Sequence, residues 1–171
     1  MDDIRIKTAP FEWRGEKIKL SCNMNVLADV QEAYGGNISR AFKGSTIRAT
    51  LTFLTAMIND ATDDDLTVRE VGREIPISEL GYISGVVLPL VTDALKRADG
   101  EDAEKKNGDS GEPLNFAWYL AVWVMALRLP ERDFWATATP YRIAKLLTAY
   151  KEIGKAKETG KPVSLAEYLG V

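Results

Sequence analysis

The spacing of apolar residues changes along the chain from an alternating pattern to a helical one. Over residues 4–20, apolar side chains alternate with polar ones on both sides of Arg14 and Gly15, which predicts two strands joined by a tight turn. After Asn25 the apolar residues recur at helical spacing, at Val26, Leu27, Val30 and Tyr34, until glycines follow at 35 and 36. Because glycine is common just past a helix C-terminus, we expect a helix to end there.

Two more helices are predicted between residues 45 and 75. The first covers about 45–59, and its apolar stripe consists of Ile47, Leu51, Leu54 and Ile58. Thr67 and Glu70 have the spacing of a capping box, in which each side chain bonds to the backbone N–H of the other residue. A short helix is therefore expected to begin after Thr67.

A longer helix is predicted from Ser78 to about Ala98, bent where Pro89 withholds a backbone N–H. The period-2 pattern is confined to about the first twenty residues. The predicted fold class is therefore mainly α with a small N-terminal β-hairpin.

Residues 99–113 differ in composition from the rest of the chain. They carry six acidic residues, two lysines and three glycines, too polar a mixture to bury enough apolar surface to offset its ordering entropy. We expect a flexible acidic linker here, with limited proteolysis cutting it first. The predicted organisation is a hairpin plus helical domain at 1–98, the linker at 99–113, and an aromatic helical segment at 114–171.

The segment after this linker is the most apolar part of the chain. Residues 116–127 are twelve consecutive apolar residues, and we expect a helix over 114–129 that breaks at Pro130. Thr139 is then predicted to cap a further helix with Pro140 in its first position. The apolar face of that helix is expected to contain Ile143, Leu146, Leu147, Tyr150 and Ile153.

The length of this apolar run and the start of the chain both argue against a membrane protein. A span needs about 20 apolar residues, and Arg128 interrupts the run after twelve. The first ten residues carry acids and no signal-peptide pattern. We expect a protein of the cytoplasm that does not bind membranes.

The composition is that of an ordinary globular protein, with 46% hydrophobic and 27% charged residues. The net charge of −3 disfavours nucleic-acid binding, which needs lysines and arginines to displace counterions. Residues 67–87 have a helix-turn-helix look, but their basic residues are matched by acidic ones. DNA binding is therefore kept only as an alternative.

The chain has few residues suited to catalysis or metal binding. It contains no histidine and a single cysteine, Cys22, which we interpret as a buried structural thiol. Asp60 could begin a calcium-binding loop, but Asp65 then stands where glycine is needed and Val71 where a bidentate glutamate is needed. We interpret these acids as solvated residues between helices, and expect no enzyme activity, no metal and no cofactor.

A helix that is apolar on every side must be surrounded by its own protein or by a partner. Both alternatives stay open for residues 114–129. In the partner-binding alternative, Trp118 and Trp123 supply buried apolar area, and Phe134 and Trp135 anchor the turn before the helix start at Thr139 and Pro140. Aromatic side chains commonly dominate interfaces.

Three stretches of the sequence resemble the tail assembly chaperones of long-tailed bacteriophages. FEWRGEKIKL and ATLTFLTAMIND are similar to the hairpin and helices of their first domain. DFWATATPYRIAKLL is similar to the Phe-Trp, Thr-Pro and helix pattern of a related chaperone group, which carries the partner-binding role over to Phe134, Trp135, Thr139 and Pro140. The acidic linker and aromatic C-terminal segment resemble the extension that some phages add by ribosomal frameshift.

The resemblance implies a non-enzymatic function. Such a protein binds the tape-measure protein, keeps it soluble, recruits tail-tube subunits around it in the host cytoplasm, and is absent from the finished virion. Two alternatives stay open: a DNA-binding or regulatory adaptor that uses residues 67–87, and a structural head-tail connector. The sequence also leaves open whether the chain forms a homo-oligomer.

Overall fold

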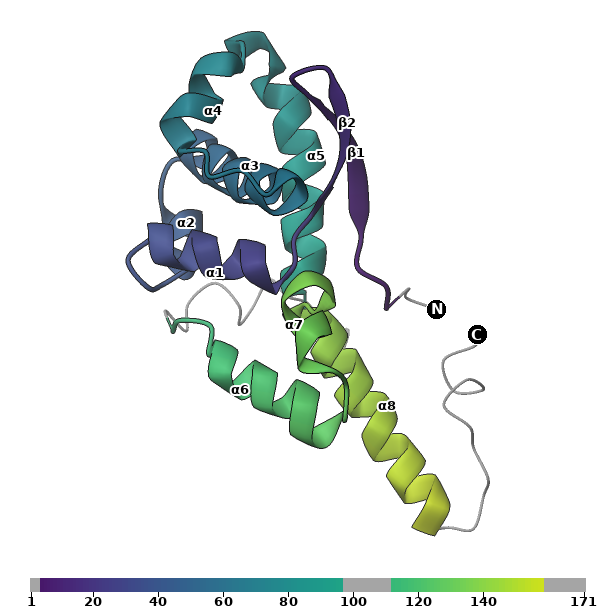
Figure 1. Ribbon diagram of the computed structural model, residues 1–171. Helices are drawn as coiled ribbons and strands as arrows, with labels where there is room; N and C mark the ends of the chain where they lie inside the picture. The colour runs from purple at the N-terminus through teal and green to yellow at the C-terminus, as the bar shows by residue number, and fades with distance from the viewer. Residues whose placement is uncertain (1–3, 97–111, 159–171) are drawn as a thin grey trace.

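The computed structural model describes residues 4–96 and 112–158, with side chains up to residue 154. A two-stranded hairpin and a group of helices make up the described part of the chain (Figure 1). The predicted fold class, mainly α with an N-terminal β-hairpin, is confirmed. In chain order, the elements are β1 (Thr8–Trp13), β2 (Glu16–Ser21), α1 (Met24–Ala33), α2 (Ser39–Lys43), α3 (Thr46–Thr62), α4 (Val68–Glu74), η1 (Ile77–Glu79), α5 (Leu80–Leu95), α6 (Phe116–Ala121), η2 (Val122–Ala126), α7 (Glu131–Thr137) and α8 (Pro140–Glu158).

The hairpin has the predicted antiparallel pairing and a two-residue turn. Trp13 pairs with Glu16, and the turn residues Arg14 and Gly15 both have positive φ, 50° and 81°. Positive φ at both central positions is the requirement of a type I′ turn, whose twist matches that of the strands. Alternation places Trp13 and Leu20 in the core.

Helix α1 begins one residue before the predicted position and ends at the predicted glycines. The Asn23 side chain accepts a hydrogen bond from the Val26 N–H at 3.0 Å and caps the first turn. At the other end, the N–H groups of Gly35 and Gly36 donate to the Glu32 and Gln31 carbonyls. This pair of bonds is a Schellman motif, and both glycines have the positive φ that it favours.

Helix α3 is central, and its predicted apolar stripe is only partly correct. Leu54 and Ile58 are buried, but Ile47 is 55% exposed. The helix is packed by α1, α4, α5 and β2 on several sides, as Figure 1 also shows, so residues outside the stripe are buried as well. Two of them, Thr52 and Thr55, are tolerated because their hydroxyls donate to the carbonyls four residues earlier, at 2.8 and 2.7 Å.

The capping box before α4 is confirmed. The Thr67 N–H donates to the Glu70 carboxylate at 2.8 Å, and the Glu70 N–H donates to the Thr67 hydroxyl at 3.3 Å. The long helix predicted from residue 78 is divided into the 3₁₀ turn η1 and helix α5, which contains Pro89 and ends at Leu95.

The C-terminal helices share one hydrophobic core with the N-terminal ones. Trp123, Phe134 and Ile143 belong to the same buried cluster as Leu27 and Phe53. Helix α7 packs on α1, and α8 packs on α5. Of the predicted linker 99–113, only residues 112 and 113 are described, so its flexibility and the boundary at 98–99 lie outside the described residues.

Candidate partner-binding surface

Helix α6 and the π-helical turn η2 form most of the segment predicted as a helix over 114–129. The Asn115 side chain caps α6 by accepting from the Trp118 N–H at 2.9 Å. In η2 the Leu127 N–H donates to the Val122 carbonyl five residues earlier. This hydrogen-bond spacing is rare in proteins, and where it occurs it is often at a functional site. Arg128, with φ of 56°, ends the segment.

Two of the predicted site residues, Trp123 and Phe134, are buried in the core. Their exposed fractions are 2% and 0%, and their rings meet edge to face with centroids 6.2 Å apart. The Trp123 indole N–H donates to the Pro130 carbonyl at 2.9 Å. In this conformation both rings stabilise the turn between η2 and α7, and neither faces a partner.

The other two aromatic site residues, Trp118 and Trp135, reach the surface. They are 51% and 36% exposed. Trp135 lies in contact with Phe116 and Phe134, with ring centroids 6.2 and 4.9 Å away. The structure therefore divides the predicted aromatic group into two buried rings and two exposed ones.

Trp118 belongs to an exposed apolar surface along α6 and η2, which we call the Trp118 face. Its members are spaced as on one side of a helix, and all are exposed: Ala117, Trp118, Ala121, Val124 and Met125. Met125, at 78%, is the most exposed of the large side chains in the face. Val124 and Met125 were not predicted as site residues, because the sequence is apolar on every side of this helix and does not indicate which side is free.

Thr139 and Pro140 begin helix α8, as predicted. Thr139 is 5% exposed, and its hydroxyl accepts from the Arg142 N–H at 3.0 Å. Burial lowers the pKa of Arg142, whose Nη1 donates to the Thr137 carbonyl at 2.6 Å. These contacts fix the direction of α8. The residues that form them come later in the chain than the Trp118 face and are not part of it.

The acids near residue 60 are not all solvated, so that interpretation was wrong for Asp60. Its carboxylate accepts hydrogen bonds from the side chains of Asn23 and Asn25, at 2.7 and 3.0 Å, and so joins α3 to α1. Over residues 4–96 and 112–158, no group of three or more acidic or cysteine side chains is arranged to hold a metal ion. Cys22 is buried as predicted, and burial raises the pKa of its thiol.

The segment 67–87, the basis of the DNA-binding alternative, contains α4 and the first half of α5. The exposed face of α4 carries Arg69 and Arg73 beside Glu70 and Glu74, so its charges are mixed. Ile83 and Val87 of α5 are buried in the core.

By length and composition alone, the helical stretch Ile77–Leu95 could cross a membrane. Core helices of other proteins pass the same test, so this is weak support for a span.

Comparison of the chain with protein-family models, with curated proteins and with solved structures gives no match.

Proposed function

We propose that this protein is a non-enzymatic tail assembly chaperone of a long-tailed phage, which binds the tape-measure protein and recruits tail-tube subunits. The observation that carries the proposal is the Trp118 face, an exposed apolar surface on a molecule whose core is filled by other residues. Contiguous exposed apolar surface marks interaction sites in many proteins. The resemblance of three sequence stretches to this chaperone family supplies the identity of the partners.

The packing of α6 leaves one of its sides for a partner. Phe116, Tyr119 and Leu120 pack against the core, whereas Ala117, Trp118 and Ala121 are exposed. An amphipathic helix of a partner could lie along the Trp118 face and bury Trp118, Val124 and Met125, as in other helix-in-groove complexes. Trp135, beside Phe116, would extend the contact toward α7.

The buried residues of the predicted site have an indirect role in this proposal. Trp123 and Phe134 hold η2 against α7, and Thr139 and Pro140 direct α8. In this proposal Trp123 and Phe134 position the Trp118 face without contacting the partner. The protein acts in the host cytoplasm and leaves before the virion is complete.

The test is co-purification with the tape-measure and tail-tube proteins encoded by the same phage. Trp118→Ala and Met125→Ser are expected to weaken retention of the tape-measure protein by about tenfold or more, with unchanged melting. Tyr150→Ala is the matched control, because Tyr150 is 55% exposed, close to the value for Trp118, but lies on α8. Unchanged retention in both Trp118-face variants would remove the face from the proposal.

Two other outcomes would replace the proposed function. Retention of the protein on DNA at low salt, lost on mutation of Arg69 and Arg73, would favour the DNA-binding adaptor. Persistence of the chain in finished particles would favour a head-tail connector.

A further inference from the structure

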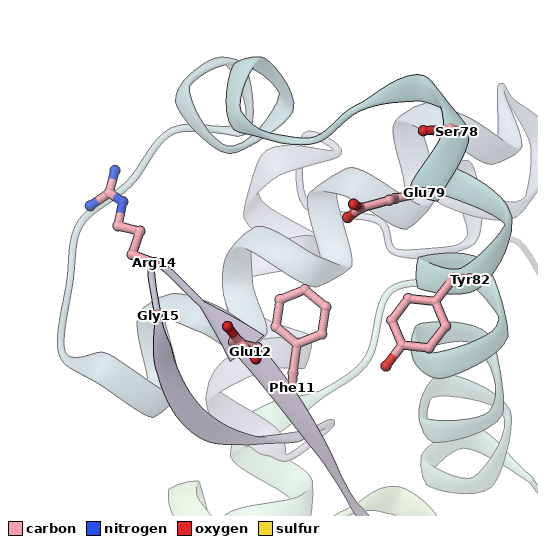
Figure 2. Close-up of a pocket in the computed structure, with 7 residues that line it drawn as sticks. All are labelled: Phe11, Glu12, Arg14, Gly15, Ser78, Glu79 and Tyr82. Carbon is pink, nitrogen blue, oxygen red and sulfur yellow. The ribbon is translucent and has the colours of Figure 1, made fainter.

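A cleft of about 540 Å³ lies between the tip of the hairpin and the start of α5. Figure 2 shows the rings of Phe11 and Tyr82 on opposite sides of this space, with the Glu79 side chain extending toward it from above. The cleft is distant in sequence from the Trp118 face. Its walls are formed by Phe11, Glu12 and Arg14 of the hairpin and by Ser78, Glu79 and Tyr82 of η1 and α5.

The side chains that line the cleft carry a net negative charge, because they include Glu12 and Glu79 but one cation. Arg14 is this cation, and the Arg14 Nε donates to the Glu74 carboxylate at 3.0 Å, with a second contact from Nη2. This hydrogen bond lowers the pKa of Glu74 and raises that of Arg14, so the pair stays charged and neutralises itself. Among the described residues, Glu12 and Glu79 form no ion pair, although Lys17 lies opposite Glu12 in the strand register.

The two aromatic rings add a second attraction for a cation. An ammonium or guanidinium group within about 6 Å of an aromatic ring is attracted by the ring quadrupole. A side chain that entered between Phe11 and Tyr82 would place its alkyl part against the rings and its charged end near Glu79. Lysine and arginine have this combination of an apolar stem and a cationic end.

An exposed apolar residue lies next to the cleft residues in the chain. Ile77 is 86% exposed and directly precedes Ser78 and Glu79, and Tyr82 is 63% exposed. Residues 80–92 contain no charged side chain. A free polyamine would gain nothing from this uncharged surface, whereas a peptide with apolar residues beside a basic one would bury part of it.

We propose that the cleft between β1 and η1–α5 binds a lysine or arginine side chain of a partner polypeptide, with an apolar residue of the same peptide lying against Ile77. This site is separate from the Trp118 face and does not depend on the proposed tail-assembly role. It gives the protein a second contact surface at the opposite end of its fold from the distal part of α8 (Figure 1).

The test is a titration of the ¹⁵N-labelled protein, followed by NMR, with the blocked tripeptide leucine-arginine-leucine. We expect shifts concentrated in the amides of Gly15, Glu79 and Tyr82. Glu79→Gln and Tyr82→Ala should each weaken binding by about three- to fivefold, as for a partly exposed charge pair. Glu16→Gln is the matched control, since Glu16 is an exposed acid of the same hairpin outside the cleft, and it should change nothing.

Three results would overturn the proposal. Equal binding of leucine-norleucine-leucine would show that the cation is not recognised. Equal weakening by Glu16→Gln would show that only the net charge of the hairpin matters. Spermidine binding at the same amides as tightly as leucine-arginine-leucine would show that the site takes a free polycation rather than a peptide.

Discussion

The amide side chain of Gln31 forms two hydrogen bonds with the backbone of Leu114, 83 positions later in the chain. Its Nε2 donates to the Leu114 carbonyl at 3.0 Å, and its Oε1 accepts from the Leu114 N–H at 2.7 Å. The two bonds satisfy both polar groups of Leu114, much as a neighbouring strand would. They attach the chain just before α6 to the last turn of α1, and so help to fix where the Trp118 face begins.

Gln31→Ala should therefore destabilise the protein. The substitution leaves a partly buried N–H and a carbonyl without their partner, and we expect a loss of about 1–2 kcal/mol in the free energy of unfolding. Chemical denaturation of the variant and the wild type measures this difference in the free energy of unfolding. Glu32→Ala, at the exposed neighbouring position, should stay within about 0.5 kcal/mol of the wild type. An equal effect of the two substitutions would mean that the Gln31 hydrogen bonds contribute nothing to stability.

Trp123 and Trp118 provide a second comparison, between a buried and an exposed indole five residues apart. Trp123→Ala removes a ring that is 2% exposed and leaves a cavity, so the expected loss is about 3–5 kcal/mol. Trp118→Ala should change stability by about 0.5 kcal/mol or less, because its ring is half exposed. Thermal melts of both variants measure the difference. A large loss for Trp118→Ala would place that ring in the core instead.

The sequence predicted the elements more reliably than the faces they bury. Thr67 and Glu70 are three residues apart, and Arg14 and Gly15 are adjacent, so their roles depend on local chemistry that can be recognised in the sequence. Burial of Thr55 and exposure of Ile47 depend on which helices surround α3, and no local pattern contains that information. The prediction assumed one buried side, whereas α3 is surrounded on several.

The same reasoning explains the outcome for the candidate site. Residues 116–127 are apolar throughout, so periodicity could not separate Trp123, which is buried, from Trp118, which is exposed. The cleft was missed because Phe11 and Tyr82 come from distant parts of the chain, and no local pattern indicates that the two side chains meet. The partner-binding role of Trp118 and Trp135 stays a prediction.

The capping box should make stability depend on acid pH. The hydrogen bonds from the Thr67 backbone and hydroxyl lower the pKa of Glu70. A carboxyl group whose pKa is lowered by folding stabilises the folded state at any pH above its pKa in the unfolded chain, which is about 4.3. This contribution is lost as the pH falls through the pKa of the folded state. The melting temperature of Glu70→Gln should therefore lie below that of the wild type at pH 7, and the difference should shrink as the pH falls below about 4.

A difference between Glu70→Gln and the wild type that is constant from pH 7 to pH 3 would contradict the ionic part of this cap. Glu79→Gln is a suitable comparison. Glu79 is also an exposed acid at a helix start, but its side chain forms no capping hydrogen bond to α5.

Two glycines with open space around them should respond in opposite ways to alanine. A Cβ at Gly15 or at Gly85 would meet no atom within 4 Å, so crowding cannot account for any difference between them. Gly15 has φ of 81°, a conformation that costs a non-glycine residue about 1–2 kcal/mol. Gly85 lies within α5, where alanine is favoured over glycine by up to about 1 kcal/mol.

Gly15→Ala should thus lower the midpoint of urea unfolding, and Gly85→Ala should raise it, with similar slopes in both cases. The double variant should lie near the wild type, because distant substitutions add. The backbone conformation alone distinguishes the two sites, so changes of the same sign would contradict this explanation. If Gly15→Ala were the neutral one, the hairpin turn would not be the type I′ turn described above.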